Sequence, residues 1–559
     1  MVPGVAEETA NQGIPKPSGG NSRASILKSS LLMSVMTALS RLFGLLREQV
    51  QGYFLGTGMG ADAFAIGSTI PNLLRRLFAE GQMTAAFVPV LKDEMVFGDR
   101  ERLTRFYSGF MTLFILLMLA ITLLGIAFAE PIVRYIFASK FADVPGKMEL
   151  TIGLTRLMFP YLMIISVAAI VQATLNAFKI FGPSAFTPVL LSIAIIAAVA
   201  LFHDSFPNPA WALAIGFVVG GIFQLLFQIP FLRKAGVRFR PTLAGLKDSS
   251  VRLVGRQFLP GILGAGVYQI NIAVSQIIAT TLAPGTVASL HYSLRLQEVV
   301  LGIFAVSVSQ VILPTMSEQS TLGDRKGLGD TLEFSVRLMA LVTIPATAGL
   351  IILGDPIIRL LFQYGRFGEE SVRMTVWALN FHAAGIFFIA LHRNATQVFY
   401  AMKDMKTPVI VAVVSMIVNV GLCLALAGPM QNGGIALAGS VASLASAALT
   451  LVILHVRGGF FNPGRMFGSL PKVLAATGAM AALLLVLRFY FGFFDIQGYG
   501  GLGMFERVRQ MGPRVAISIP AAMLVFVVAA RFLHVREVGE ISAMVKRRIN
   551  RRKAGRDRI

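Results

Sequence analysis

The sequence is poor in the residues that build disulfides, metal sites and water-facing surfaces. Its 559 residues include one cysteine, Cys423, which excludes an internal disulfide framework and a thiolate zinc cluster. The six histidines are scattered and form no HExxH-type pair. Only 14% of the residues are charged, fewer than a water-soluble domain normally carries. We therefore expect no metal site, no catalytic residues and no cofactor.

Hydrophobic residues are abundant instead, at 55% of the chain with a mean hydropathy of +0.71. Stretches of about 20 residues carry almost no charge, and that is the length a helix needs to cross a bilayer. Lysine and arginine number 50 against 28 acidic residues, a net charge of +22. Because these basic residues must lie between the apolar stretches or at special sites within them, the charge does not indicate a nucleic-acid binder.

Hydropathy predicts an all-α polytopic membrane protein with about fourteen transmembrane helices. The segments expected to be helical are 26–52, 62–92, 106–129, 150–178, 184–203, 210–232, 251–281, 286–318, 332–353, 370–401, 408–428, 433–456, 471–492 and 514–533.

Basic residues predict the orientation of these helices. Alternate connections such as 233–247 and 457–472 are rich in lysine and arginine, whereas 204–209 and 429–432 contain none. The positive-inside rule places the basic connections in the cytoplasm, and an even number of helices leaves both termini there. The polybasic tail 546–559 agrees, and it suits an anionic lipid surface and a solvated topogenic signal equally well.

Parts of the chain recur at a fixed spacing. EPIVRYIF at 130–137 resembles DPIIRLLF at 355–362, and Pro89 of AFVPVLKDE matches Pro314 of VILPTMSEQ. Both pairs have the same offset in numbering, 225, which indicates an internal duplication.

A third match pairs Thr187-Pro188 with Thr407-Pro408, at an offset of 220. Each half would hold six helices, an even number, so the repeat is parallel and related by an axis along the membrane normal. Such repeats are typical of transporters, whose substrate sites lie between the halves near the midplane.

We therefore expect two six-helix lobes followed by a final helix pair. Residues 1–25 are rich in proline, glycine and serine and are expected to be a disordered cytoplasmic lead rather than a signal peptide. The other expected divisions are a first lobe at 26–232, a cytoplasmic linker at 233–250, a second lobe at 251–456, the helix pair at 457–535 and a basic cytoplasmic tail at 536–559.

Arginine occurs inside the apolar segments. Arg41 and Arg47 lie in the first segment, about 120° apart around a helix, so both can line one broad cavity wall. The eighth segment holds Arg295 and Glu298, an i,i+3 pair.

The second segment contains adjacent arginines, Arg75 and Arg76, with Glu80 four residues after the latter. Pro71 and Gly81 are its expected bend points. At the outer start of the same segment is an acid, Asp62, which is explained either as a helix N-cap or as a gate contact.

Each arginine at the centre of a membrane helix costs about 2.5–3.5 kcal/mol. The intramembrane acids are too few to neutralise them, so the segments carry a positive surplus. A water-filled cavity that receives an anion resolves this cost, and guanidinium groups bind phosphate oxygens bidentately. The surplus predicts a phosphate or diphosphate substrate. Arg76 is explained as well by pairing with Glu80, and Arg47 by snorkelling to the interface.

Several motifs resemble the MurJ/MviN family of bacterial lipid II flippases. They are SRLFGLLRE at 40–48, GADAF at 60–64, PNLLRRLFAEG at 71–81, HYSLRLQEVVLGIFAVSVSQVILP at 291–314 and QVFYAMKDMKTP at 397–408. The resemblance covers about residues 26 to 533. It implies the MATE-like fold of the MOP exporter superfamily, in which the final helix pair is implicated in holding the lipid tail.

The resemblance also implies roles for individual residues. The family's diphosphate-binding arginines fall on Arg41, Arg47, Arg75 and Arg295, and its gate and supporting charges fall on Asp62, Arg76, Glu80 and Glu298. One position departs from the pattern: some members carry an acid before the arginine of the eighth segment, where this chain has Leu294.

The implied function is to move lipid II, an undecaprenyl-diphosphate-linked muropeptide, from the inner to the outer leaflet of the bacterial inner membrane by alternating access. No bond is made or broken, so the protein is not expected to be an enzyme. We expect a monomer that depends on the membrane potential or on a coupling ion of unknown identity. The alternative is an exporter of another polyprenyl-linked saccharide or of drugs. A pump for cationic drugs would need an acidic cavity, whereas the predicted cavity is basic.

Overall fold

The structure, a computed structural model, describes residues 23–78, 82–303, 305–496 and 499–539. Every regular element within these ranges is a helix. The chain forms two compact units, unit 1 ending at Ala273 and unit 2 beginning at Val274. The boundary between the units falls inside one long helix, α9.

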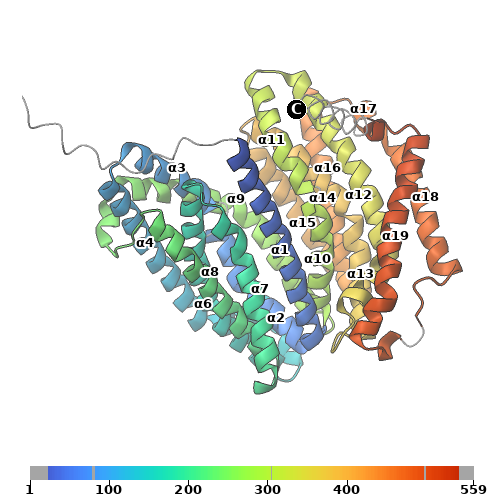
Figure 1. The fold of residues 1–559 in the computed structure, drawn as a ribbon, viewed down its shortest axis with the longest axis horizontal. Helices are drawn as coiled ribbons and strands as arrows, with labels where there is room; N and C mark the ends of the chain where they lie inside the picture. Colours follow the sequence, from blue (N-terminus) through green and yellow to red (C-terminus); the bar gives the residue numbers. More distant parts are fainter. Residues whose placement is uncertain (1–22, 79–81, 304, 497–498, 540–559) are drawn as a thin grey trace, which may run out of the picture. The chain divides into compact units, whose positions relative to one another are not determined.

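Figure 1 shows the fold. Within the described residues, unit 1 consists of seven complete long helices, most of an eighth and several short ones. They are α1 Arg23–Leu55, α2 Met59–Phe78, α3 Gln82–Phe97, α4 Arg100–Ala127, α5 Ala129–Pro131, the π-helix η1 Ile132–Phe137, the 3-10 helix η2 Ser139–Asp143, α6 Lys147–Ala177, α7 Gly182–Phe202, the 3-10 helix η3 His203–Ser205, α8 Ala210–Lys234, the 3-10 helix η4 Leu243–Lys247 and most of α9 Ser249–Thr280.

Unit 2 contains the end of α9 and a further set of long and short helices. They are α10 Thr286–Ile303, α11 Ala305–Thr321, α12 Arg325–Phe362, α13 Glu369–Ala384, α14 Ile386–Ala401, α15 Lys406–Met430, α16 Asn432–Gly458, α17 Pro463–Phe467, α18 Leu470–Leu485, the π-helix η5 Val486–Tyr490, the 3-10 helix η6 Tyr499–Gly501 and α19 Met504–Phe532.

The predicted membrane segments coincide with these helices. Among the described residues, ten helical stretches are long and apolar enough to cross a membrane, and each overlaps most of one predicted segment. The other four predicted segments carry charges in their interior. Their described residues are also helical and correspond to α1, to α2 with α3, to α9, and to α10 with α11.

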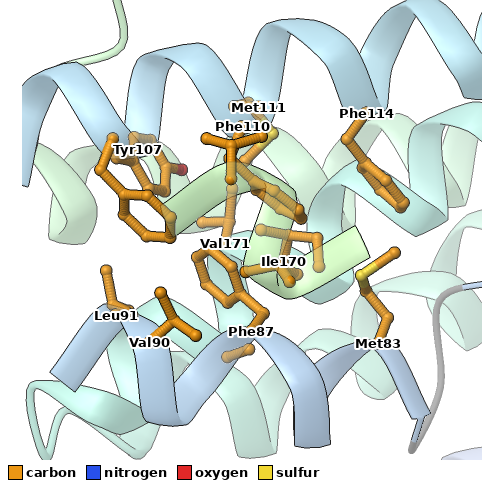
Figure 2. Packing of buried hydrophobic residues seen from close by; sticks show 14 of the residues in the cluster. Met83, Phe87, Val90, Leu91, Tyr107, Phe110, Met111, Phe114, Ile170 and Val171 are labelled. Carbon is orange, nitrogen blue, oxygen red and sulfur yellow. The ribbon is translucent and has the colours of Figure 1, made fainter. Parts of the chain in front are cut away.

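Aromatic side chains of α3 and α4 pack against each other in unit 1 (Figure 2). Phe106, Phe110 and Phe114 recur every fourth residue of α4 and so line one face of that helix. Phe87 of α3 points toward this row, with its ring centroid 4.6 Å from that of Phe110. In a bilayer such contacts matter because lipid tails are as apolar as the side chains, so close packing rather than exclusion of water favours association.

Equivalent helices of the two halves, α4 and α12, begin with the same kind of N-cap. Asp99 caps α4 by accepting a hydrogen bond from the N–H of Arg102 at 2.7 Å. Asp324 caps α12 in the same way, accepting from the N–H of Gly327 at 2.8 Å. The two caps have an offset of 225, the same as the sequence repeat.

The halves also repeat the turn that ends the fourth and tenth predicted segments. Lys179 and Lys403 follow α6 and α14 with φ of 63° and 60°. The next residues, Ile180 and Asp404, each donate a backbone hydrogen bond of 2.9 Å to a carbonyl five residues earlier, which is a Schellman motif. The hydroxyl of Thr407 also donates to the Asp404 carboxylate, and this contact holds the pKa of Asp404 below its usual value.

The third sequence match is wrong by one helical turn. α7 begins at Gly182 and α15 at Lys406, an offset of 224 rather than 220. Thr187 therefore lies five residues into its helix, whereas Thr407 lies one residue into its own. The Thr-Pro dipeptides are not equivalent positions of the repeat.

The final helix pair is fastened to α12 by arginines that donate to main-chain carbonyls. α18 and α19 lie side by side (Figure 1) and both contact α12. Arg507 of α19 donates to the carbonyl of Gln363, and Arg488 of η5 donates to that of Ile352. Gln363 is the C-cap of α12, and the residue four after Ile352 is Pro356, which has no N–H, so neither carbonyl has an i+4 donor within the helix.

Replacing Lys403 with glycine should stabilise the protein by about 0.5–1 kcal/mol. A positive φ crowds the Cβ of any L-residue against its backbone, and glycine removes that strain at some cost in unfolded-chain entropy. Lys403 is exposed, so little packing is lost. The measurement is thermal unfolding in detergent, with Lys403→Ala as the control that removes the charge and keeps the Cβ. Equal melting temperatures for the glycine and alanine variants would contradict this account.

Candidate functional site

The arginines of α1 differ in their surroundings. The Arg41 side chain is exposed on the surface of unit 1. Arg47 is largely buried and forms an ion pair with its neighbour Glu48, with 2.7 Å between Nη2 and Oε1. Glu48 is itself 5% exposed, so this acid is a buried partner that the sequence interpretation did not use.

α2 carries both signs of charge, separated along its length. Arg75 and Arg76 lie in its last turn and are half-buried. The Nε of Arg75 donates to the Oδ1 of Asn72 at 3.2 Å, which orients the guanidinium along the helix. Glu80, the predicted partner of Arg76, lies outside the described residues, so that pairing stays a prediction.

Asp62 is not the N-cap of α2, because the helix begins at Met59 and Asp62 lies in its first turn. Its carboxylate instead forms an ion pair with Lys147, the first residue of α6, with 2.7 Å between Oδ2 and Nζ. The two side chains are 1% and 3% exposed. The same ammonium lies 3.9 Å from the centre of the Phe141 ring.

The helix dipoles act differently on the two residues of this ion pair. A carboxylate in the first turn of a helix is favoured by the helix dipole, whereas a lysine at a helix start is not. Lys147 is therefore held in an unfavourable place by its contacts with Asp62 and Phe141. Sequence reasoning missed it because the two charges are 85 residues apart.

In unit 2, Arg295 and Glu298 of α10 form the predicted i,i+3 ion pair at 2.9 Å. Their side chains are 41% and 56% exposed, so neither charge is sealed inside unit 2. Leu294, which stands where some family members have an acid, is also exposed, at 39%.

The opposite face of α10 is fixed to α13. Ser293 forms a 2.8 Å hydrogen bond with Nδ1 of the buried His382, and Gln297 donates to the carbonyl of the same residue. Ser293 and Gln297 are one turn apart, and Arg295 lies between them in sequence. At 100° per residue, Arg295 therefore points about 160° away from that fixed face.

The predicted site residues divide between the units. Unit 1 holds Arg41, Arg47, Arg75, Arg76 and Asp62, on α1 and α2, which are in contact. Unit 2 holds Arg295 and Glu298 on α10.

The chain is similar to known proteins over most of its length. The family described as lipid II flippase MurJ matches residues 52–497. A probable lipid II flippase MurJ of Treponema pallidum (strain Nichols) is 38% identical over 431 residues, 76% of this chain and 80% of that relative. A relative of the same description from Vibrio cholerae (serotype O1) is 33% identical over 466 residues, 82% and 89% of the two chains.

Solved structures agree with these matches. A lipid II flippase MurJ in an inward closed conformation has a TM-score of 0.74 at 25% identity, covering 90% of this chain and 99% of that one. An inward-facing MATE-family multidrug resistance transporter of the MOP superfamily has a TM-score of 0.63 at 14% identity, covering 77% and 98%. The second likeness shows the fold alone. Together they confirm the predicted all-helical, MATE-like membrane fold.

Replacing Lys147 with methionine should destabilise the protein by about 3–5 kcal/mol, because the substitution leaves the Asp62 carboxylate buried without its cation. Thermal unfolding in detergent measures the effect. The combined Asp62→Asn and Lys147→Met variant should lose less than the two single losses added together. Lys140→Met is the control, since that lysine pairs with Asp143 at the surface and should cost less than about 1 kcal/mol. A loss from Lys147→Met as small as the control's would show that the pair is not needed for stability.

Proposed function

Because this chain belongs to the MurJ family of lipid II flippases, we propose that Arg41, Arg47, Arg75 and Arg295 hold the diphosphate of lipid II while the lipid crosses the membrane. The protein is a multi-pass membrane transporter of peptidoglycan biosynthesis in the bacterial inner membrane, and not an enzyme. Its residues must therefore carry an anionic headgroup across a medium in which an unpaired charge is costly.

The observation that carries the proposal is the balance of charge on α1 and α2. Residues 36–78 contain four arginines and two acids, Glu48 and Asp62. Both acids are engaged by bases, Glu48 by Arg47 and Asp62 by Lys147 from another helix. By count, residues 36–78 thus carry two more arginines than acids, and an anionic substrate offsets the cost of such an excess of positive charge on membrane helices.

The accessibility of the arginines supports the same proposal. Arg41 is exposed and Arg295 is 41% exposed, so both can reach a ligand that enters from outside their units. A diphosphate offers several oxygens, and each guanidinium can donate two hydrogen bonds to it in a fixed geometry. The sugars and peptide of lipid II would occupy a wet cavity, and its isoprenoid tail would stay in lipid along the final helix pair, residues 457–535.

Asp62 is proposed to act at a gate rather than on the substrate. Its ion pair with Lys147 ties the first turn of α2 to the start of α6. Further along α2, Pro71 cannot donate a backbone hydrogen bond, which makes it a natural bend point between this tie and Arg75. Bending there would move Arg75 relative to Asp62 as the transporter alternates between inward-open and outward-open states.

The same excess of positive charge couples the carrier to the membrane potential. If the empty carrier has a net positive cavity, each charge that moves through the field is worth about 2.3 kcal/mol per 100 mV. Bound diphosphate would neutralise most of that charge, so the potential would act mainly on the return of the empty carrier. We propose that the membrane potential, or a coupling ion that substitutes for it, drives this return and that a monomer is sufficient.

Lipid II translocation in proteoliposomes tests the site. Arg41→Ala, Arg75→Ala and Arg295→Ala should each slow flipping about 10- to 100-fold, since a hydrogen bond to a charged group is worth about 1.5–3 kcal/mol. Arg295→Lys should recover only part of the rate because lysine lacks the bidentate fork. Arg373→Ala is the matched control, an exposed arginine paired with Glu370 in unit 2.

The same assay separates the alternatives. Alanine variants that flip lipid II at the wild-type rate would reject the arginines as its site. Wild-type protein that moves another polyprenyl-linked saccharide faster than lipid II would favour the exporter alternative. An imposed potential that leaves the wild-type rate unchanged would reject the proposed drive.

Orientation can be tested with single cysteines, because the native Cys423 is buried and can be replaced by serine. We expect a cysteine at Asp204, whose side chain is 91% exposed, to react with a membrane-impermeant maleimide on intact spheroplasts. A cysteine at the exposed Lys403 should react only after permeabilisation, as should one in the tail after residue 546. The reverse pattern would place both termini outside.

A further inference from the structure

Two arginines of unit 1 that lie outside the proposed diphosphate site share one acid, Glu130 of α5. The Nη2 of Arg134, one turn further along in η1, donates to the Oε1 of Glu130 at 3.2 Å. The Nη2 of Arg156, on α6, lies 3.7 Å from the Oε2 of the same carboxylate. This second contact is longer than a hydrogen bond, so Glu130 does not accept one from Arg156. The cluster of these three side chains holds two positive charges and one negative charge.

This cluster lies at the boundary of the hydrocarbon core. Residues 106–129, which precede Glu130, and residues 157–178, which follow Arg156, contain no charged side chain. Each run is long enough to cross the core, which is about 30 Å thick. Because Glu130 and Arg156 form an ion pair, the two runs end on the same side of the membrane. By the predicted orientation the third segment ends outside, so this boundary is the outer one.

An exposed apolar stripe leads along α4 to the cluster. Leu116 and Leu123 are exposed, and Glu130 follows them at the same seven-residue spacing, which keeps all three on one side of a helix. Tyr135 of η1 is also exposed, and tyrosine is enriched at membrane interfaces. The side chains of Arg134 and of its acid are 38% and 47% exposed, as is that of the second arginine at 47%. A lipid can therefore contact the arginines and this α4 stripe at the same time.

The second half of the chain has the same motif with the opposite balance of charge. The repeat offset of 225 carries Glu130 to Asp355 and Arg134 to Arg359. Arg359 donates to Asp355 at 3.0 Å and also to Glu369, so two acids share one arginine there. That cluster has no need of an anion, whereas the cluster of unit 1 has one positive charge in excess. The duplication alone does not account for the second arginine of unit 1.

We propose that Arg134 and Arg156 bind the phosphate of an anionic phospholipid in the outer leaflet. A phosphodiester carries one negative charge, which balances the excess of the cluster, and guanidinium groups donate readily to its free oxygens. The acyl chains lie along the α4 stripe, and the headgroup lies where the charge-free runs end. A zwitterionic lipid offers the same phosphate but brings a cation that the arginines repel. The inference concerns residues outside the diphosphate site and does not depend on it.

Photolabelling of the full-length protein in phosphatidylcholine nanodiscs tests the proposal, with crosslinks mapped by mass spectrometry. The probes are phosphatidylglycerol and phosphatidylcholine that carry a diazirine at the same place in one acyl chain. In the wild type, the phosphatidylglycerol probe should label peptides of α4 and η1 about ten-fold more than the phosphatidylcholine probe, since hydrogen bonds between charged groups are strong. Arg134→Gln and Arg156→Gln should each lower this preference, and the double variant should abolish it.

Glu130→Gln is the sharper test, because it removes the carboxylate that competes with the phosphate. This variant should raise the preference for phosphatidylglycerol, whereas a cluster that serves only as a structural ion pair would gain none. Arg156→Lys should keep part of the preference, and it replaces the glutamine variants should they unfold, as judged by their thermal transitions. Lys140→Gln is the matched control, since it removes one positive charge from the same connection at an exposed pair with Asp143. It should leave the preference unchanged.

Several results would overturn the proposal. They are equal labelling of the wild type by both probes, an unchanged preference in a folded double variant, and a lower preference in Glu130→Gln. A loss in Lys140→Gln as large as that in the arginine variants would indicate general attraction to a basic surface instead. Competition by inorganic phosphate as effective as that by unlabelled phosphatidylglycerol would indicate a simple anion site. Because the readout is labelling and not transport, these results are independent of whether lipid II is flipped.

Discussion

The cost of placing charge in hydrocarbon governs the organisation of this protein. A helix that crosses a bilayer satisfies its own backbone, but an ionised side chain on it needs a partner, water or a ligand. In unit 1, the acids of α1 and α2 meet this need through bases: Glu48 pairs with Arg47, and Asp62 pairs with Lys147. The arginines of residues 36–78 outnumber the acids, four to two. If the arginines bind the diphosphate as proposed, the transported anion is part of the charge balance of the membrane domain as well as its cargo.

The internal duplication explains the helix caps and turns that the two halves share. It does not explain where the charged residues of the candidate site lie. The caps Asp99 and Asp324 and the left-handed lysines Lys179 and Lys403 occur at equivalent places in both halves. In both halves, the segment after the last helix is also tied back to an earlier one. Ser108 accepts from the N–H of Arg240 at 3.0 Å, and Glu333 accepts from that of Asn462 at 2.8 Å.

The charged residues of the candidate site do not follow this symmetry. The repeat offset of 225 carries Asp62 to Val287 and Arg75 to Val300, and it carries Arg295 back to Ile70. The duplication therefore supplied two similar folds, and the charge was placed on them separately. This asymmetry fits a substrate whose diphosphate, glycan and tail are chemically distinct and so need different surroundings.

Sequence reasoning found what is local or periodic and missed what depends on distant contacts. The helices were predictable because apolar runs of bilayer length carry a strong signal, and the Arg295–Glu298 pair because it lies within one turn. The partner of Asp62 was not, since nothing near it in the chain points to Lys147. The Thr-Pro match failed for a related reason: a dipeptide is short enough to recur by chance four residues from the equivalent position, which the helix starts place at an offset of 224.

α2 shows how these requirements combine in one element. Its first turn is tied to α6 by a buried ion pair, its middle contains a proline, and its last turn carries Arg75. One of its faces is a stripe of aliphatic side chains, Ile70, Leu73, Leu74 and Leu77, against an apolar cavity. A helix fixed at one end and free to bend in the middle can move its charged end only if the space behind it can open and close. Close-packed side chains would resist that movement, whereas an apolar hollow beside the helix leaves room for it. The cavity and the arginine are thus two consequences of the same need, which is to move a charge within a bilayer without exposing it to lipid.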